Sequence, residues 1–264
     1  MPATTAGWAG RRVLFTGGRT FLGEAVGREL LTRGAELVTL APHAAEPSLF
    51  GGWQGKSVHV VHGRPDNLFR LHSAMAVHEV AAVFHFPPRA EGDADRTTSA
   101  LAQAARMYSS RMPVVVAGTN PGAAVDGLSV AAFEAVFGPG DQDHSYPLPR
   151  SAAQLLLGGA FVPPADGPAK DWVFVRDAAR ACLLAAEAVA RGGPGAFAFA
   201  SGWRLSERGL ALALRDVFLG NSPPPAPPPA NPLGWAPGES LAEALTETLD
   251  WHRDSTPPRL RVAA

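Results

Sequence analysis

The sequence predicts an α/β fold in which a parallel sheet is covered by helices on both faces. Short runs rich in Val, Leu and Phe alternate with longer segments of helical periodicity, and some of these runs, such as 113–117, are apolar throughout. Such runs are typical of strands buried on both faces of a sheet, as in doubly wound folds. A glycine-rich turn also joins the first strand to the first helix.

The first half begins with an expected strand at 11–15, a turn, and a helix over 21–31 that ends before Gly34. Glycine just after the last periodic residue is a common helix stop signal. The first β-α-β unit therefore spans 11–40. Further strands are expected at 35–40, 57–61, 80–86 and 113–117, and a further helix at 97–108.

The second half has a less regular pattern. The proline-rich segment 222–232 is expected to be a stiff connector or exposed loop, because proline lacks the N–H group and fixes φ. Ser206 is expected to cap a helix, and Ser240 with Glu243 has the spacing of a capping box. The expected elements are helices at 151–157, 177–190, 206–218 and 240–252, and strands at 172–175 and 196–200.

Composition and charge favour a soluble protein with a small-molecule partner. The chain has 264 residues, 46% of them hydrophobic, and a formal net charge of −1. This balance attracts neither a nucleic acid nor an anionic membrane, and no run reaches the roughly 18 apolar residues of a membrane span. The single cysteine, Cys182, excludes an intrachain disulfide and suits the cytoplasm. The scattered histidines lack metal-ligand spacing, so no metal site is expected.

Residues 16–23, TGGRTFLG, lie where a dinucleotide fingerprint is expected, between the first strand and the first helix. Gly17 permits a tight turn, Gly23 lets the helix approach the strand, and the helix N-terminus offers N–H groups to a pyrophosphate. The other interpretation is a turn that serves packing only. The predicted cofactor-binding residues here are Gly17, Gly18, Arg19, Thr20, Phe21, Leu22 and Gly23.

Five blocks, in order along the chain, resemble the extended short-chain dehydrogenase/reductase superfamily, which includes NAD-dependent epimerases and dehydratases. The glycine turn resembles its T-G-G-x-G-F-[IL]-G, and residues 82–86, AVFHF, resemble its V-F-H-L-A strand. Residues 136–141, 171–181 and 233–237 resemble its V-Y-G-P-G-D turn, its substrate-lobe signature and its tail. The second half is most similar to 3β-hydroxysteroid dehydrogenase/isomerase-like members, with nucleotide-sugar epimerases and dehydratases close behind.

The resemblance implies a Rossmann dinucleotide-binding domain over 1–135 and a small, shortened C-terminal substrate lobe over 136–264 that returns strands and helices to the main fold. It implies an NAD(P)-dependent oxidoreductase, isomerase or epimerase acting on a small hydroxy or keto substrate, with His85 beside the cofactor. A homodimer is compatible with it, because members of the family often dimerise, but the oligomeric state stays open.

The cofactor site departs from the family's pattern. Thr20 replaces the middle glycine, so a β-branched side chain stands where the backbone should approach the phosphates. Ala41 replaces the acidic residue that binds the adenosine ribose, so a preference for NAD is unsupported. Arg19 offers forked donors to a 2′-phosphate, which slightly favours NADP, although a solvated surface arginine fits equally well. Arg64 replaces the family's adenine-contacting aspartate.

The largest departure concerns catalysis. In the family a tyrosine exchanges the hydroxyl proton, and a lysine four residues later lowers the pKa of that tyrosine from about 10. The chain's two tyrosines are Tyr108 and Tyr146, and neither has a lysine at that spacing. Tyr146 is followed there by Arg150, whose planar, permanently charged head is not equivalent to lysine.

Two alignments of Tyr146 remain open. In one it is the catalytic tyrosine with a lysine-to-arginine change; in the other, which we favour, 138–150 is the loop after the family's sixth strand. The second leaves only 119–135 for the family's serine, catalytic helix and next strand, so that helix would be deleted. The catalytic candidates are Tyr146 and Thr119, although a threonine after a strand is more often a turn residue.

Two functions therefore stay open. The first is an NAD(P)-dependent enzyme that uses Tyr146 or an unconventional acid or base. The second is a catalytically degenerate Rossmann protein, a pseudoenzyme kept as a binding or partner protein. Family resemblance favours the first and the residues favour the second.

Overall fold

The computed structural model describes six segments of the chain, and every structural statement below concerns them. They are residues 7–41, 57–87, 93–119, 128–192, 195–225 and 229–255. Residues 226–228 of the proline-rich segment lie outside them. The rest of that segment up to residue 231 forms neither helix nor strand, as expected for proline-rich chain.

The chain divides into two compact units. Unit 1 comprises residues 1–132 and 179–198, and unit 2 comprises residues 133–178 and 199–264. The chain therefore leaves unit 1, returns to it through one long helix, and leaves it again.

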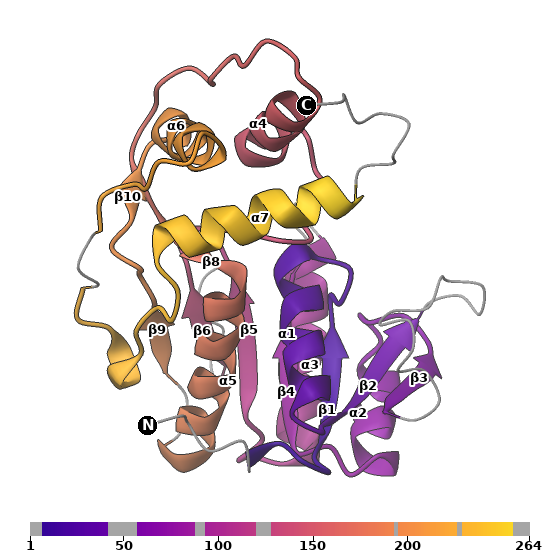
Figure 1. The fold of residues 1–264 in the computed structure, drawn as a ribbon. Coiled ribbons are helices and arrows are strands. Elements are labelled where there is room, and N and C mark those ends of the chain that lie inside the picture. The colour runs from indigo at the N-terminus through magenta and orange to yellow at the C-terminus, as the bar shows by residue number, and fades with distance from the viewer. Residues whose placement is uncertain are drawn as a thin grey trace. The chain divides into compact units, whose positions relative to one another are not determined.

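A seven-stranded parallel sheet forms the centre of unit 1, in the order β3-β2-β1-β4-β5-β6-β9. Helices α1 and α5 cover one face and α2 and α3 the other (Figure 1). The predicted doubly wound Rossmann fold is thus confirmed. The strands are β1 Arg12–Thr16, β2 Glu36–Ala41, β3 Val58–His62, β4 Ala82–His85, β5 Val114–Gly118, β6 Ser129–Ala132 and β9 Ala196–Ala198; the helices are α1 Phe21–Thr32, α2 Leu68–Val77, α3 Asp93–Tyr108 and α5 Val175–Gly192.

The core of unit 1 lies on both faces of this sheet. Leu14 and Val83 belong to the cluster that packs against α2 and α3. Because successive side chains of a strand point to opposite faces, Phe15 and Phe84 lie on the other face. There the ring of Trp8 lies 5.7 Å from that of Phe84 and its indole N–H donates to Glu187 of α5, at 2.9 Å. Burial on both faces explains the apolar runs inside β1 and β4.

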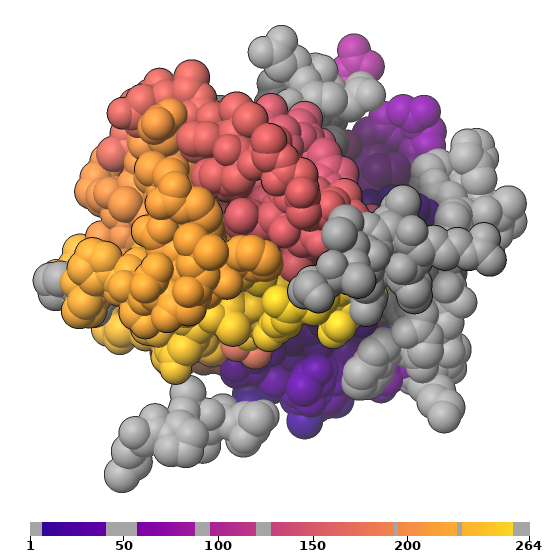
Figure 2. Space-filling model, turned by 45° about the horizontal axis from the view of Figure 1, so that its top comes forward, coloured from indigo at the N-terminus to yellow at the C-terminus, as the bar shows by residue number. Residues whose placement is uncertain are grey.

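A small mixed sheet, in the order β10-β8-β7, belongs to unit 2. Helices α4, α6 and α7 of this unit contact one another, and Figure 2 shows them side by side in red, orange and yellow. No helix in the described part of the chain has the length and apolarity to cross a membrane. The elements are β7 Ala135–Phe137, β8 Lys170–Phe174, β10 Arg204–Leu205, α4 Pro147–Leu156, α6 Glu207–Phe218, the 3-10 turn Pro232–Gly234 and α7 Leu241–Ser255.

Both predicted helix caps of unit 2 are confirmed. The Ser206 hydroxyl accepts from the amide of Gly209, at 3.1 Å. Before α7, Ser240 N–H donates to the Glu243 carboxylate at 2.8 Å, and Glu243 N–H donates to Ser240 Oγ at 3.3 Å. Each cap satisfies amides that have no acceptor inside the helix.

The structure corrects several element boundaries. Helix α4 begins at Pro147 rather than at residue 151, because proline fits the first helical turn, where its missing N–H costs nothing. Helix α2 and the strands β6 and β10 were not predicted, and β7 was expected only as the family's sixth strand before residue 138. α2 is amphipathic, but Arg, His and Ser dilute its apolar face, and its clearest signal is the cap Asn67, whose side chain accepts from Arg70 N–H at 3.0 Å.

Asp171, at the second position of β8, connects several segments of unit 2. Its carboxylate is 3% exposed and accepts from the amides of Ser201 at 2.6 Å and Gly202 at 2.8 Å. Its own amide donates to the carboxylate of Glu134, at 2.7 Å. A buried carboxylate that satisfies two amides stabilises the loop before β10, which is the role the structure gives it.

The substitution Asp171→Ala is expected to lower the free energy of unfolding by about 2 to 4 kcal/mol, because two inward-facing amides lose their charged acceptor. Urea unfolding followed by tryptophan fluorescence measures the change. The matched control is Asp250→Ala on the exposed face of α7, whose carboxylate pairs with Arg253. That control should change stability by no more than about 0.5 kcal/mol; equal losses in both variants would show that the Asp171 contacts carry no special stability.

Candidate functional site

The glycine turn between β1 and α1 is held against the end of β4. Gly17 has a φ of +79°, and a Cβ added to it would overlap the carbonyl oxygen of Phe86. A Cβ added to Gly23 would overlap the carbonyl oxygen of Gly17 and lie 2.7 Å from Thr20 Oγ1. Only glycine fits these two positions, as the fingerprint requires.

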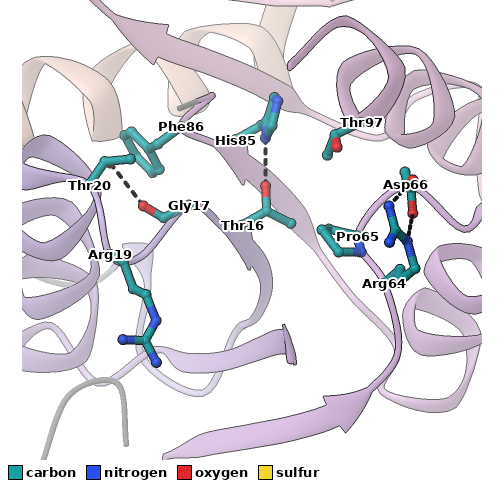
Figure 3. Close-up of a pocket in the computed structure, with 10 residues that line it drawn as sticks. All are labelled: Thr16, Gly17, Arg19, Thr20, Arg64, Pro65, Asp66, His85, Phe86 and Thr97. Atoms are coloured by element: carbon teal, nitrogen blue, oxygen red, sulfur yellow. Dashed lines mark hydrogen bonds and ion pairs between the residues drawn. The ribbon is translucent and has the colours of Figure 1, made fainter. Parts of the chain in front are cut away.

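Thr20 plays a different part from the one its sequence position suggests. Its side chain folds back onto the turn instead of standing in the path of the phosphates: the hydroxyl donates to the carbonyl of Gly17 at 2.8 Å and accepts from Gly23 N–H at 3.1 Å (Figure 3). Thr20 is thus the N-cap of α1. The expected obstruction is replaced by a cap, because threonine is a good N-cap residue.

The amides at the start of α1 remain directed away from the helix body. The first intrahelical bond runs from Glu24 N–H to the Thr20 carbonyl, at 2.9 Å, and the cap takes the amide of Gly23. The amides of Phe21 and Leu22 precede that bond and cannot donate within the helix. Such amides, at the positive end of the helix dipole, suit an anion such as a phosphate.

His85, the last residue of β4, is held between two threonine hydroxyls. Its Nδ1 lies 2.6 Å from Thr16 Oγ1 and its Nε2 lies 2.9 Å from Thr98 Oγ1 of α3. The imidazole is 1% exposed, and burial lowers the pKa of His85 to about 4. The ring is therefore neutral near pH 7, and we assign it a positioning role that joins β1, β4 and α3.

A cavity of about 450 Å³ opens beside the turn (Figure 3). This volume lies within the range of about 300 to 1,000 Å³ of small-molecule sites. Arg64 lies at the cavity wall in a two-pronged ion pair with Asp66, at 3.0 and 2.9 Å, and this pair lowers the pKa of the Asp66 carboxyl. The lining residues are Thr16, Gly17, Arg19, Thr20, Arg64, Pro65, Asp66, His85, Phe86 and Thr97.

Most of the predicted cofactor residues meet at this cavity. Gly17, Arg19, Thr20 and His85 line it, and the remaining ones, Gly18, Phe21, Leu22 and Gly23, belong to the same turn and the start of α1. The partner hydroxyls of His85 were not predicted. The sequence could have indicated Thr16, because this residue begins the fingerprint block. It gave no comparable indication for Thr98, which is one small polar residue in an alanine-rich helix.

The two catalytic candidates belong to different units. Thr119 follows β5 in unit 1 as a half-buried bend residue, and Tyr146 is the N-cap residue of α4 in unit 2. Residues 138–146 form the loop between β7 and α4, which favours the second alignment of Tyr146. Arg150 lies one helical turn on, with its amide donating to the Tyr146 carbonyl at 3.3 Å.

The connection between β5 and β6 is unusually short. The two strands pair in parallel, with Val115 opposite Ser129, yet only the ten residues 119–128 join them. Parallel neighbours normally need a crossover of about a dozen residues or more, usually a helix. The connection contains neither tyrosine nor lysine and is too short for a catalytic helix of several turns.

Metal-ligating side chains do not gather in the described residues: no group of three or more His, Cys, Asp or Glu among them has the geometry to hold an ion. Cys182 is fully buried in α5, and burial raises the pKa of its thiol well above its usual value. A thiol in that state is a packing group rather than a nucleophile.

Comparison with known proteins finds a family profile that resembles part of the chain. The profile described as NAD dependent epimerase/dehydratase family matches residues 124–199. No sequence among curated proteins matches the chain significantly.

Solved structures share the fold at low sequence identity. UDP-glucose 4-epimerase of Thermotoga maritima, determined with UDP-glucose, is 17% identical with a TM-score of 0.67, over 92% of this chain and 99% of that one. UDP-glucose 4-epimerase of Thermus thermophilus, complexed with NAD, is 20% identical with a TM-score of 0.65, over 93% and 100%. dTDP-glucose 4,6-dehydratase of Bacillus anthracis, complexed with NAD, is 14% identical with a TM-score of 0.70, over 93% and 97%.

The profile match and the shared fold confirm the resemblance to the NAD-dependent epimerase/dehydratase family of extended short-chain dehydrogenases. The three solved structures are nucleotide-sugar enzymes, so they give no support to the predicted closeness to hydroxysteroid dehydrogenases.

The pKa of His85 leads to a prediction about acid stability. It is about 6.5 for an exposed histidine and about 4 in the folded chain, so between these pH values the unfolded chain binds more protons. The stability that neutral His85 provides is complete above pH 6.5 and is lost as the pH falls towards 4. The loss should approach about 3 kcal/mol.

Urea unfolding of the wild type and of His85→Gln, at about pH 7.5 and pH 4.5, isolates this contribution. The wild type should lose more stability on acidification than the variant, whose glutamine does not titrate. His252, whose pKa is also lowered to about 4 chiefly by burial, is present in both proteins and cancels. Parallel losses in the two proteins would exclude His85 as the responsible group.

Proposed function

We propose that this chain, which has the fold of the extended short-chain epimerases and dehydratases, binds NAD or NADP at the glycine turn of unit 1 and lacks the proton-transfer pair of that family. One observation carries the proposal: the amides of Phe21 and Leu22 begin α1 at a turn that only glycine can form, beside a cavity. Positive potential, amides without an acceptor inside the helix and open volume together suit a pyrophosphate.

The residues of the turn fit such a group. The amides of Phe21 and Leu22 would hold the pyrophosphate, and the exposed guanidinium of Arg19 adds a positive charge at the cavity wall. His85 would hold the end of β4 in place without exchanging protons, since both of its ring nitrogens face threonine hydroxyls. When bound, the nicotinamide would supply a hydride acceptor or donor.

The choice between NAD and NADP depends on few residues. Arg19 at the cavity supports NADP, because a guanidinium offers forked donors to a 2′-phosphate. The neighbouring structures described above are complexes with NAD and do not support that preference. Titration with both reduced cofactors decides between them.

Several residues support a protein without the family's catalytic chemistry. Lys170 pairs with Glu207 at 2.9 Å in unit 2, so this lysine serves an ion pair. Tyr108 packs beside the core of unit 1, with its ring 6.4 Å from that of His72. Tyr146 with Arg150 is the remaining pair, and a planar guanidinium is a poor substitute for lysine. If turnover survives, the neighbours favour a nucleotide sugar over other small hydroxy or keto compounds as the substrate.

The substitution Gly23→Ala should weaken NADH binding at least about tenfold, because the added Cβ overlaps the Gly17 carbonyl and disturbs the cap. Fluorescence titration with NADH and NADPH measures the dissociation constants, and circular dichroism checks the fold. The matched control is Gly192→Ala in unit 1, where an added Cβ meets nothing within 4 Å. Equal binding by wild type and Gly23→Ala would place the site elsewhere.

The purified chain with NAD and UDP-glucose is expected to form no UDP-galactose above the rate without protein, because it lacks a lysine beside either tyrosine. Tyr146→Phe should therefore leave the product signal in chromatography unchanged. Epimerisation that Tyr146→Phe abolishes would instead establish Tyr146 as the proton donor and the first alignment as correct.

A further inference from the structure

Helix α2 exposes two large apolar side chains on the surface of unit 1. Phe69 is 76% exposed and Val77 is 73% exposed, and the exposed residues Ser73 and Ala76 between them are small. We call these four residues the α2 face. The residues that α2 buries in the core of unit 1 are Leu71, Ala74 and Met75. The α2 face therefore lies on the side of the helix that is turned away from the sheet.

The neighbouring helix α3, which covers the same face of the sheet, has a different surface. Among its residues 96–108, Met107 is the one large apolar side chain that is exposed. The other exposed residues of this part of α3 are Arg96, Ser99, Gln103 and Arg106. Exposed apolar side chains that gather on one element, beside a polar neighbour, indicate an interaction surface.

The spacing of the α2 face suits a second copy of the same helix. Phe69, Ser73 and Val77 are four residues apart, so they form one of the ridges that run along a helix surface. Two such ridges interdigitate in the commonest class of helix packing, with the axes crossing at about −50°. The small Ser73 at the centre lets the two helices approach closely. A two-fold axis beside Ser73 then places Phe69 of one copy against the partner's Val77.

The charges beside the α2 face favour the same antiparallel arrangement. Arg70 lies exposed in the first turn of α2, and Glu79 lies exposed just after its last turn. An antiparallel pair brings Arg70 of one copy towards the partner's Glu79, whereas a parallel pair would bring like charges together. Because the two charges have opposite signs, the α2 face also has no net charge that would attract an anionic membrane or a nucleic acid.

We infer that two copies of this chain associate through α2, packed antiparallel about a two-fold axis beside Ser73. The dimer is weak, because a helix of ten residues is about 15 Å long and such a pair buries less than the roughly 1,200 Å² of a standard interface. A dissociation constant of the order of 10 μM is expected. The contact lies outside the glycine turn, so it goes beyond the proposed function and does not depend on it.

Sedimentation velocity of the full chain tests the association. The wild type should change from monomer at about 1 μM to mostly dimer at about 100 μM. Phe69→Asp should remain monomeric at both concentrations, because a carboxylate would be buried against the partner's Val77. The matched control is Val162→Asp in unit 2, which also changes an exposed apolar residue and should dimerise like the wild type. Circular dichroism checks that each variant is folded.

Two results of this experiment would overturn the inference. One is a wild type that is monomeric at about 100 μM, which is about ten times the expected dissociation constant. The other is a Phe69→Asp variant that dimerises as well as the wild type, because the dimer would then form through another surface.

A cysteine at the centre of the α2 face tests the two-fold axis. At the interaxial distance of about 8 to 10 Å of packed helices, the Cα atoms at the point of contact are about 5 Å apart, which a disulfide can span. Ser73→Cys, oxidised at about 100 μM with copper phenanthroline, should give a disulfide-linked dimer in non-reducing electrophoresis. The native Cys182 is fully buried and does not interfere.

The control for this experiment is Ser99→Cys, which places the thiol on the exposed side of α3. It should form little linked dimer under the same conditions, because that side of α3 remains in solvent when two copies meet through α2. Linkage of Ser73→Cys that is no faster than linkage of Ser99→Cys would overturn the antiparallel contact at Ser73.

Discussion

The close approach of the glycine turn to the end of β4 is the constraint on which unit 1 depends. Phe86 N–H donates to the Thr16 carbonyl at 3.1 Å, and the Phe86 carbonyl occupies the space that a Cβ on Gly17 would need. His85 binds Thr16 from the neighbouring strand. These contacts hold β1 and β4 together where the strand order reverses, and they fix the direction in which α1 leaves the sheet. The position of the N-terminus of that helix, which suits an anion, is therefore set by packing.

The same constraint explains which change in the fingerprint is tolerated. Thr20 replaces a glycine with a hydroxyl that makes two hydrogen bonds inside the turn, so the change adds a cap to α1. Gly23 allows no such compensation, because its missing Cβ is what lets the first helical turn lie against the Gly17 carbonyl. A fingerprint with threonine at its middle position can therefore still form the turn, since the amides of Phe21 and Leu22 keep their orientation.

Local patterns predicted the central strands well because β4 and β5 are buried on both faces and appear in the sequence as continuous apolar runs. These patterns failed for elements and contacts that depend on tertiary packing. Only ten residues separate strand β6 from the end of β5, so no familiar spacing predicts it. At the site, His85 was predicted from its place in a family block, but its bond to Thr98 depends on how α3 packs. The Thr20 cap was missed because a side chain that could obstruct a ligand can equally turn back on the backbone.

Because packing alone requires Gly17 and Gly23, these glycines would persist in a chain that had lost its ligand. The features that separate a binding site from an inherited turn are those that folding does not require. Arg19 and Arg64 are exposed, and exposed charges contribute little to stability. Both line the cavity near the start of α1, a position where a guanidinium would suit a phosphate-bearing ligand. Nucleotide binding, as we propose it, therefore depends on the two arginines and the Phe21 and Leu22 amides more than on the glycine motif.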